Sequence, residues 1–151
     1  ATEIQAAIAY NQFKKFKVKK EIRKYNKNLI HKKLISHKKW KNQFSIINEN
    51  DNTDPNWFGI PILINKKFSK NKNSYLNKLQ EDGVENRPII SGNFVNQPSF
   101  KLYKFKNHNY KKTLKNSQII HDRGFFIGLQ NHKISNNLAN FVVEKLLKIF
   151  I

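Results

Sequence analysis

The stretch from Gly83 to Phe100, GVENRPIISGNFVNQPSF, differs in composition from the rest of this 151-residue chain. It holds two of the four prolines, two of the five glycines and one of the three arginines. Glycine permits positive φ or close backbone approach, and the neighbouring Ser91 and Asn93 supply short polar groups. A strand leaving through such a turn can present amides, hydroxyls and the Arg87 guanidinium to a polar ligand. An ordinary turn with a structural arginine explains the same residues, so both interpretations stay open.

The sequence contains no self-sufficient active site. It has no G-x-x-x-x-G-K-[ST] phosphate loop and no G-x-S-x-G elbow. The five histidines show no paired ligand spacing and no cysteine assists them, so we expect no metal site. His121, beside Asp122, fits a surface position at a helix end. His132 lies just after the end of a predicted strand, where binding residues often lie, and a binding role and a plain surface role are evenly balanced.

The net charge of +19 invites a nucleic-acid hypothesis. However, Lys outnumbers Arg by 26 to 3 while Asn, Ile and Phe are abundant, which is the bias of A/T-rich codons. A protein that reads bases or clamps phosphates would use more Arg. We therefore interpret the charge as background and expect no specific nucleic-acid partner.

The composition also bears on the compartment. The absence of Cys fits a reducing environment. No apolar run reaches the ~20 residues of a membrane span, and the N-terminus lacks the layout of a signal peptide. We expect a cytoplasmic protein with no membrane partner.

The first predicted element is a long N-terminal helix. Thr2 and Gln5 form a capping box, and Ile4, Ala7 and Ile8 give an apolar stripe at helical spacing. Helical character continues through residues 13–37. The predicted buried side of this part consists of Phe13, Phe16, Ile22, Tyr25, Ile30 and Leu34.

Three short strands alternate with helices in the remaining chain. The strands are residues 57–64, where Pro61 implies an edge or a bulge, residues 84–90, and residues 125–129. Ser69 is predicted to cap the helix that ends at Gly83, and a short helix ends at Gly124. Ser135 caps a last helix whose apolar side is predicted to hold Leu138, Phe141, Val142, Leu146 and Ile149. This order predicts an α/β sandwich, with a small three-stranded, mainly antiparallel sheet covered on one face by helices.

Four segments resemble one enzyme family in order and spacing. The stretch GVENRPIISGNFVNQPSFK is similar to the small-domain signature of DegT-type nucleotide-sugar aminotransferases and dehydratases. ATEIQAAIAYNQFKK, WFGIPILI and RGFFIGLQNH resemble the helix, strand and strand that accompany it. The resemblance covers essentially all 151 residues. It is strongest to the branch acting on GDP-linked 4-keto-6-deoxymannose, which includes perosamine synthase and the 3-dehydratase.

The resemblance implies a fold-type-I enzyme that uses pyridoxal 5'-phosphate (PLP) in surface-polysaccharide (O-antigen) synthesis. Residues 1–38 would be the linking helix region from a large domain, and residues 39–151 the C-terminal small domain. The cofactor's lysine or histidine and its aspartate would lie in the large domain, so we expect no catalytic or cofactor-binding residue in this chain. The full-length enzyme would be a homodimer that takes a nucleotide sugar and, for amination, an amino-acid donor.

The resemblance also names candidate substrate-binding residues, which are Arg87, Ser91, Gly92, Asn93, Phe94 and His132. Asn86 stands where Thr or Ser is common and Asn96 where Arg is common, and residues 39–56 match poorly. Two alternatives remain, namely a basic nucleic-acid-binding module and a non-functional remnant of a split gene. As a lone piece, the chain would leave the stripe of Ile4, Ala7 and Ile8 exposed.

Overall fold

A four-stranded antiparallel sheet forms the centre of the computed structural model, which describes residues 2–103 and 114–148. Its strands are β1 (Phe44–Ile46), β2 (Gly59–Ile64), β3 (Asn86–Arg87) and β4 (Gly124–Gly128). The order across the sheet is β1-β2-β4-β3. The predicted α/β class is correct, but the predicted count of three strands is wrong. The missed strand, β1, is three residues long, too short to show an alternating pattern.

Pro61 lies in an inner strand with an uninterrupted register to β4, so the predicted edge position or bulge is wrong. β2 pairs with β1 on one side and with β4 on the other, where Pro61 faces Phe126. The Pro61 carbonyl accepts from the N–H of Ile47, just beyond the last residue of β1. Proline has no N–H to return a bond on that side. The hydrogen bonds between β1 and β2 therefore end next to Pro61, because its nitrogen has no hydrogen to donate to β1.

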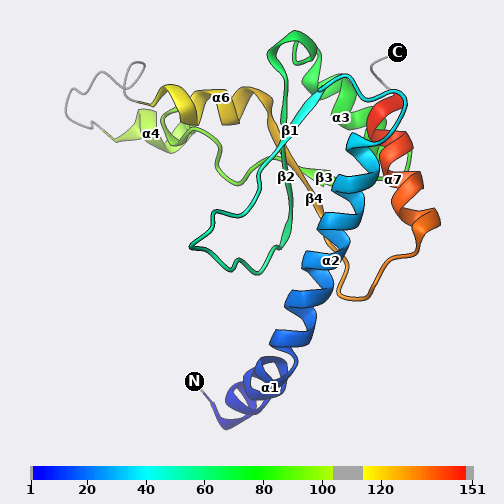
Figure 1. The fold of residues 1–151 in the computed structure, drawn as a ribbon. Helices are drawn as coiled ribbons and strands as arrows, with labels where there is room; N and C mark the ends of the chain where they lie inside the picture. Colours follow the sequence, from blue (N-terminus) through cyan, green and yellow to red (C-terminus); the bar gives the residue numbers. More distant parts are fainter. Residues whose placement is uncertain (1, 104–113, 149–151) are drawn as a thin grey trace.

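The hydrophobic core lies between one face of the sheet and three helices, α2 (Phe16–Ile35), α3 (Lys72–Glu81) and α7 (Asn136–Lys148). Alternate residues of β2 and β4 point into it, as strand geometry requires. Figure 1 shows α2 and α7 running side by side over this face. The core includes the strand residues Ile60, Ile62, Ile64, Phe125 and Ile127. The rings of Phe44, Tyr75 and Phe125 form an aromatic cluster within this core.

The predicted N-terminal helix is two helices that meet at Lys15, α1 (Glu3–Lys14) and α2. The Thr2–Gln5 capping box is confirmed. Of the six residues predicted to be buried, only Ile30 and Leu34 are, while Phe13 is 74% exposed. α1 buries no residue and projects away from the sheet (Figure 1), so its apolar stripe is exposed as predicted.

Helix α3 ends as predicted but does not start as predicted. Gly83 has a φ of 89°, and the N–H groups of Gly83 and Val84 bond to the carbonyls of Gln80 and Leu79. This is the paired pattern of a Schellman motif. Ser69 does not cap α3; it closes the 3-10 turn η1 (Lys66–Phe68), and Asn71 precedes α3 without a side-chain cap.

Helix α7 has the predicted cap, since the N–H of Leu138 donates to the Ser135 hydroxyl. Its fully buried side is shifted from the prediction to Ala139, Val143, Leu146 and Leu147. Of the predicted residues Leu146 is fully buried, whereas Leu138 is 41% exposed and Phe141 is 40% exposed. Ile149 lies outside the described residues.

The predicted strand 84–90 is reduced to two residues because Pro88 lacks the donor for further pairing. After it come the 3-10 turn η2 (Phe94–Asn96) and α4 (Pro98–Leu102). Helix α6 (Lys115–Arg123) then leads directly into β4. No helix among the described residues is long and apolar enough to cross a membrane.

Candidate functional site

Two of the three arginines line one pocket beside β3 and β4. Helix α2 supplies Arg23, β3 supplies Arg87, and Phe58 and Phe126 form an aromatic wall with ring centroids 5.7 Å apart. Glu85, Gly128, Leu129 and Asn131 complete a volume of about 240 Å³. In a chain that otherwise uses Lys for positive charge, this pairing of arginines marks the pocket as a candidate site for an anionic ligand.

Arg23 is held by two amides from separate loops. Its Nε donates to Asn131 Oδ1 at 3.0 Å, and its Nη1 donates to Asn56 Oδ1 at 3.3 Å. A guanidinium has five N–H donors. Within residues 2–103 and 114–148, no further hydrogen bond or ion pair of Arg23 is present. Three donors are therefore available to a ligand at the pocket.

Arg87 pairs with the carboxylate of Glu85, which lies just before β3. Its Nε and Nη2 donate to Glu85 Oε1 at 3.0 and 2.7 Å, and its side chain is 63% exposed. A pair this exposed contributes little to stability. It leaves Arg87 able to exchange its carboxylate for an incoming anion.

The turn from Ser91 to Phe94 does not line the arginine pocket; it packs against α6. Gly92 has a φ of 58°, as a turn glycine permits. The Asn93 N–H donates to His121 Nδ1 at 3.3 Å, and Asn93 Nδ2 donates to Gln118 Oε1 at 2.9 Å. Asn93 is 3% exposed, so the structure gives this part of the predicted site a local structural role.

The other two predicted residues of this group show different surroundings. The Ser91 carbonyl accepts from Gln97 Nε2 at 2.7 Å. Phe94 is 55% exposed and meets the Phe100 ring edge-to-face at 6.0 Å. Neither side chain lies with Arg87 in the pocket.

His132 lies in the loop after β4 with an exposed side chain. Its carbonyl accepts from Asn26 Nδ2 at 2.8 Å, and the same amide group donates to the Gln130 carbonyl at 3.2 Å. Asn26 Oδ1 accepts from the N–H of Ile134 at 3.1 Å. Asn26 is completely buried in α2, so it fixes the loop that carries both His132 and Asn131.

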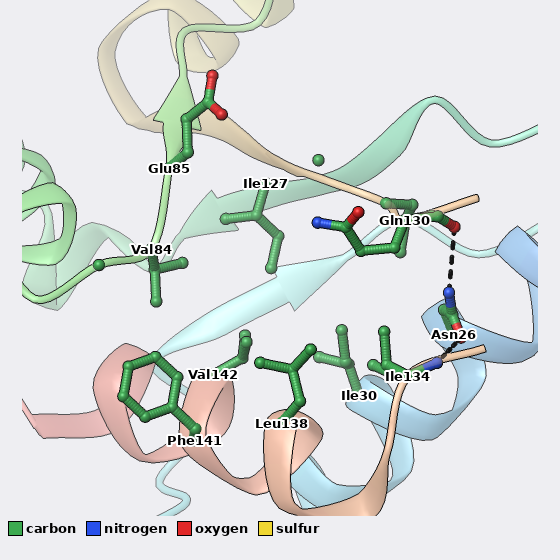
Figure 2. Close-up of a pocket in the computed structure, with 13 residues that line it drawn as sticks. Asn26, Ile30, Val84, Glu85, Ile127, Gln130, Ile134, Leu138, Phe141 and Val142 are labelled. Carbon is green, nitrogen blue, oxygen red and sulfur yellow. Dashed lines mark hydrogen bonds between the residues drawn. The ribbon is translucent and has the colours of Figure 1, made fainter. Parts of the chain in front are cut away.

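A second, larger cavity of about 370 Å³ lies on the helical side of β4 (Figure 2). Ile30, Leu138, Phe141 and Val142 face Val84 and Ile127 across it. Glu85 is the one charged residue in its wall. An apolar wall with one carboxylate does not suit an anion, so the arginine pocket is the better candidate.

The segment before Phe58 is fastened to α2 by ionic and aromatic contacts. Lys27 is 2% exposed, with its ammonium 4.4 Å from the centroid of the Trp57 ring. Trp57 Nε1 donates to Glu49 Oε1 at 2.8 Å, and Glu49 Oε2 lies 3.1 Å from Lys24 Nζ. Burial lowers the pKa of Lys27, and the hydrogen bond from Trp57, followed by that from Lys24, lowers the pKa of Glu49.

The two pockets beside β4 do not fit PLP by themselves. Neither contains a lysine to bind the cofactor's aldehyde or a histidine to stand in its place. The part of the chain that the structure describes also has no group of three His, Asp or Glu residues able to hold a metal ion.

Sequence reasoning missed Arg23, Phe58 and Asn131. Arg23 lies among lysines in the predicted N-terminal helix, outside its predicted buried side and more than sixty residues before Arg87. The low number of arginines could have pointed to Arg23, since each of only three arginines departs from the strong bias toward lysine. Phe58 and Asn131 carry no such signal, because the fold alone brings them together.

Comparison with known proteins gives one consistent result. Residues 1–147 match the sequence profile of the DegT/DnrJ/EryC1/StrS aminotransferase family. The chain is 26% identical over 138 residues to GDP-4-keto-6-deoxy-D-mannose 3-dehydratase of Yersinia pseudotuberculosis, covering 91% of this chain and 33% of that protein. It is also 26% identical over 149 residues to lipopolysaccharide biosynthesis protein RfbH of Salmonella typhimurium, covering 99% of this chain and 32% of that protein.

Solved structures agree on the fold. The E. coli GDP-4-keto-6-deoxy-D-mannose-3-dehydratase with bound hydrated PLP superposes with a TM-score of 0.75 at 24% identity, over 93% of this chain and 34% of that one. A mutant of GDP-4-keto-6-deoxymannose-3-dehydratase with bound GDP-perosamine gives a TM-score of 0.76 at 24% identity, with the same coverage. The chain thus spans about a third of the length of the relatives it matches.

Proposed function

The chain belongs to the DegT/DnrJ/EryC1/StrS aminotransferase family, and we propose that it works as the C-terminal part of a PLP-dependent enzyme that aminates or dehydrates a nucleotide-linked 4-keto-6-deoxysugar. The observation that carries the proposal is its similarity, over 91–99% of its length, to a GDP-sugar 3-dehydratase and a lipopolysaccharide biosynthesis protein. Surface-polysaccharide precursor synthesis is the corresponding pathway.

Within this proposal, residues 1–38 link the chain to a large domain and residues 39–151 form the small domain. The exposed apolar residues of α1 support the first assignment, because a helix that buries nothing here has a surface for a further domain. The core also takes Ile30 and Leu34 from the first range, so the end of α2 packs against the proposed small domain. The full-length enzyme is proposed to be a homodimer.

PLP, in this proposal, is held by residues outside this chain, which spans about a third of the length of the relatives it matches. Chemistry at the sugar carbonyl belongs to the cofactor. The share of this chain is to bind the nucleotide sugar, orient it and exclude water. By itself the chain is expected to bind substrate weakly and to turn nothing over.

The proposed substrate contact is the arginine pocket. Arg87, predicted from the sequence, lines it together with two exposed or half-exposed phenylalanines. Arginines and aromatic faces suit the phosphates and rings of a nucleotide sugar. Phe94 and His132 are exposed and remain proposed as outer contacts. Ser91, Gly92 and Asn93 are proposed to shape the turn that carries Phe94.

The test is to express the chain together with the coding sequence that precedes Ala1 in its gene. The expected product is a yellow dimer that contains PLP and converts GDP-4-keto-6-deoxymannose to a 3-deoxy or a 4-amino sugar in the presence of glutamate. An upstream reading frame without a PLP domain would refute the proposal. A complete but inactive protein would instead support the remnant of a split gene.

The nucleic-acid alternative is tested by a titration with duplex DNA at two salt concentrations. The family match over 147 residues favours the enzyme. Charge alone predicts weak binding that disappears with salt and does not depend on base sequence. Sequence-selective binding at physiological salt would favour the alternative.

A further inference from the structure

The three consecutive residues Asn56, Trp57 and Phe58 connect α2 to the arginine pocket in three different ways. Asn56 accepts a hydrogen bond from Arg23 Nη1. Trp57 packs under Lys27, one helical turn beyond Arg23 on α2. Phe58 forms a wall of the pocket. One short segment therefore sets the position of the guanidinium and of the aromatic ring beside it.

Trp57 is the anchor of this segment. Its ring faces the Lys27 ammonium at 4.4 Å, and its indole N–H donates to Glu49, which is paired with Lys24. A further ion pair joins Lys20 of α2 to Asp54 in the same loop. Lys20, Arg23, Lys24 and Lys27 recur at helical spacing and face the loop of residues 49–57. Several weak contacts together therefore hold the loop of residues 49–57 against α2.

Arg23 differs from the lysines around it because its positive charge is not paired with an acidic or aromatic group of the loop. Lys20, Lys24 and Lys27 each meet an acidic or aromatic group of the loop. Arg23 meets two neutral amides, which orient it without cancelling its charge. An oriented, uncompensated guanidinium with three available donors at a pocket is the arrangement that binds an oxyanion.

We propose that Arg23 binds the diphosphate of the nucleotide sugar and that Asn56, Asn131 and Trp57 are its positioning residues. The inference rests on the proposed function and adds a residue that the sequence resemblance did not assign. Arg87 differs because its charge is shared with Glu85. The oxyanion could also be the carboxylate of an amino-acid donor, and the test separates the two sources.

The first experiment measures ligand affinity with the purified chain. GDP-mannose and glutamate are titrated separately and followed by NMR. Arg23→Gln is expected to weaken GDP-mannose binding about tenfold or more, because a charge-assisted hydrogen bond is lost. Arg23→Lys should also weaken it, since a point charge does not replace the planar fork. The matched control is Arg123→Lys, because Arg123 does not line the pocket.

Each outcome decides one statement. Unchanged GDP-mannose affinity in Arg23→Gln overturns the inference and leaves the proposed function intact. Loss of glutamate binding alone assigns Arg23 to the amino donor and also overturns it. A wild-type chain that binds no GDP-mannose at millimolar concentration refutes both the inference and the proposed substrate contact.

The second experiment tests positioning without any ligand. Three arginines give three Nε–Hε NMR signals, and Arg23→Lys identifies one of them. Trp57→Phe keeps a ring for Lys27 but removes the donor to Glu49. We expect it to shift or broaden the Arg23 signal and to weaken GDP-mannose binding at least threefold, while Trp40→Phe changes neither. Glu49→Gln, which keeps an acceptor for Trp57, should retain the signal. An Arg23 signal unchanged in Trp57→Phe would overturn the positioning role.

Discussion

Gly92 and His121 are in contact so close that no side chain fits between them. A Cβ placed on Gly92 would lie 2.4 Å from His121 Nδ1, the atom that accepts the Asn93 N–H. The φ of 58° adds backbone strain for any residue other than glycine. The turn and helix α6 therefore depend on each other.

Gly92→Ala should destabilise the chain by about 3 kcal/mol, from strain in the left-handed region and overpacking against the imidazole. Chemical denaturation measures the free energy of unfolding. Gly83→Ala is the control, because Gly83 also has positive φ but the nearest atom to its Cβ is 3.9 Å away; it should cost about 1 kcal/mol. His121→Ala in the Gly92→Ala background should recover part of the loss, and strictly additive effects would contradict the contact.

Three lysines converge on Asp82 at the end of α3. Lys145 Nζ and Lys148 Nζ lie 3.6 Å from its oxygens, Lys78 Nζ lies 4.0 Å away, and the side chain is 13% exposed. Burial raises the pKa of Asp82, but the lysines together outweigh it and the pKa is lowered from 3.8. Asp82 therefore stabilises the fold above about pH 3.8, and this contribution disappears as pH falls through the lower, folded-state pKa.

Asp82→Asn should be less stable than the wild type at pH 7 and lose less stability between pH 5 and pH 2. Urea unfolding at several pH values measures both effects. Asp51→Asn, in an exposed loop, should leave the pH profile unchanged. Parallel profiles for wild type and Asp82→Asn would refute the ionic role of Asp82.

Parts of the fold with a local cause were predictable from sequence. The Thr2 cap, the Ser135 cap and the left-handed Gly83 each depend on residues within five positions, and all three are confirmed. Strand β2 was predictable as an apolar run, but its place inside the sheet was not. That place depends on β1, whose three residues carry no readable pattern.

The candidate site was predictable only in part, because its residues come from separate elements. Arg87 was found within a signature-like stretch, and it does line a pocket. Asn93 was expected near substrate, but Gln118 and His121 of α6 satisfy its amide and N–H. Arg23 and Asn131 meet across 108 positions of sequence, and no local pattern encodes such a pair.

The exposed stripe on α1 predicts self-association of the chain. Ile4 is 74% exposed and Ile8 is 60% exposed, one helical turn apart on the same face. Ile4→Gln with Ile8→Gln keeps the net charge and should shift the sedimentation profile toward the monomer. Ile90→Gln is the control, since Ile90 is 83% exposed but lies outside α1. A wild-type chain that stays monomeric at high concentration would contradict the prediction.

Asn26 is the polar residue whose change should cost most. It is fully buried, donates to the carbonyls of Gln130 and His132, and accepts from the N–H of Ile134. In Asn26→Asp, the Nδ2 donor is replaced by a carboxylate oxygen, which cannot donate a hydrogen bond to the carbonyls of Gln130 and His132. The expected loss is about 3 kcal/mol or more at pH 7, because a buried charge and two acceptors are left unpaired.

The pH dependence of Asn26→Asp separates this cause from a simple packing defect. Burial beside two carbonyls should raise the pKa of the new carboxyl above its unfolded value. Folding then takes up a proton, so the variant should gain stability relative to wild type as pH falls from 7 to 5. Asn28→Asp, exposed on the same helix, should show neither the loss nor the gain. A deficit in Asn26→Asp that stays constant over this range would mean that lost shape, not unpaired charge, destabilises the loop that holds Asn131 against Arg23.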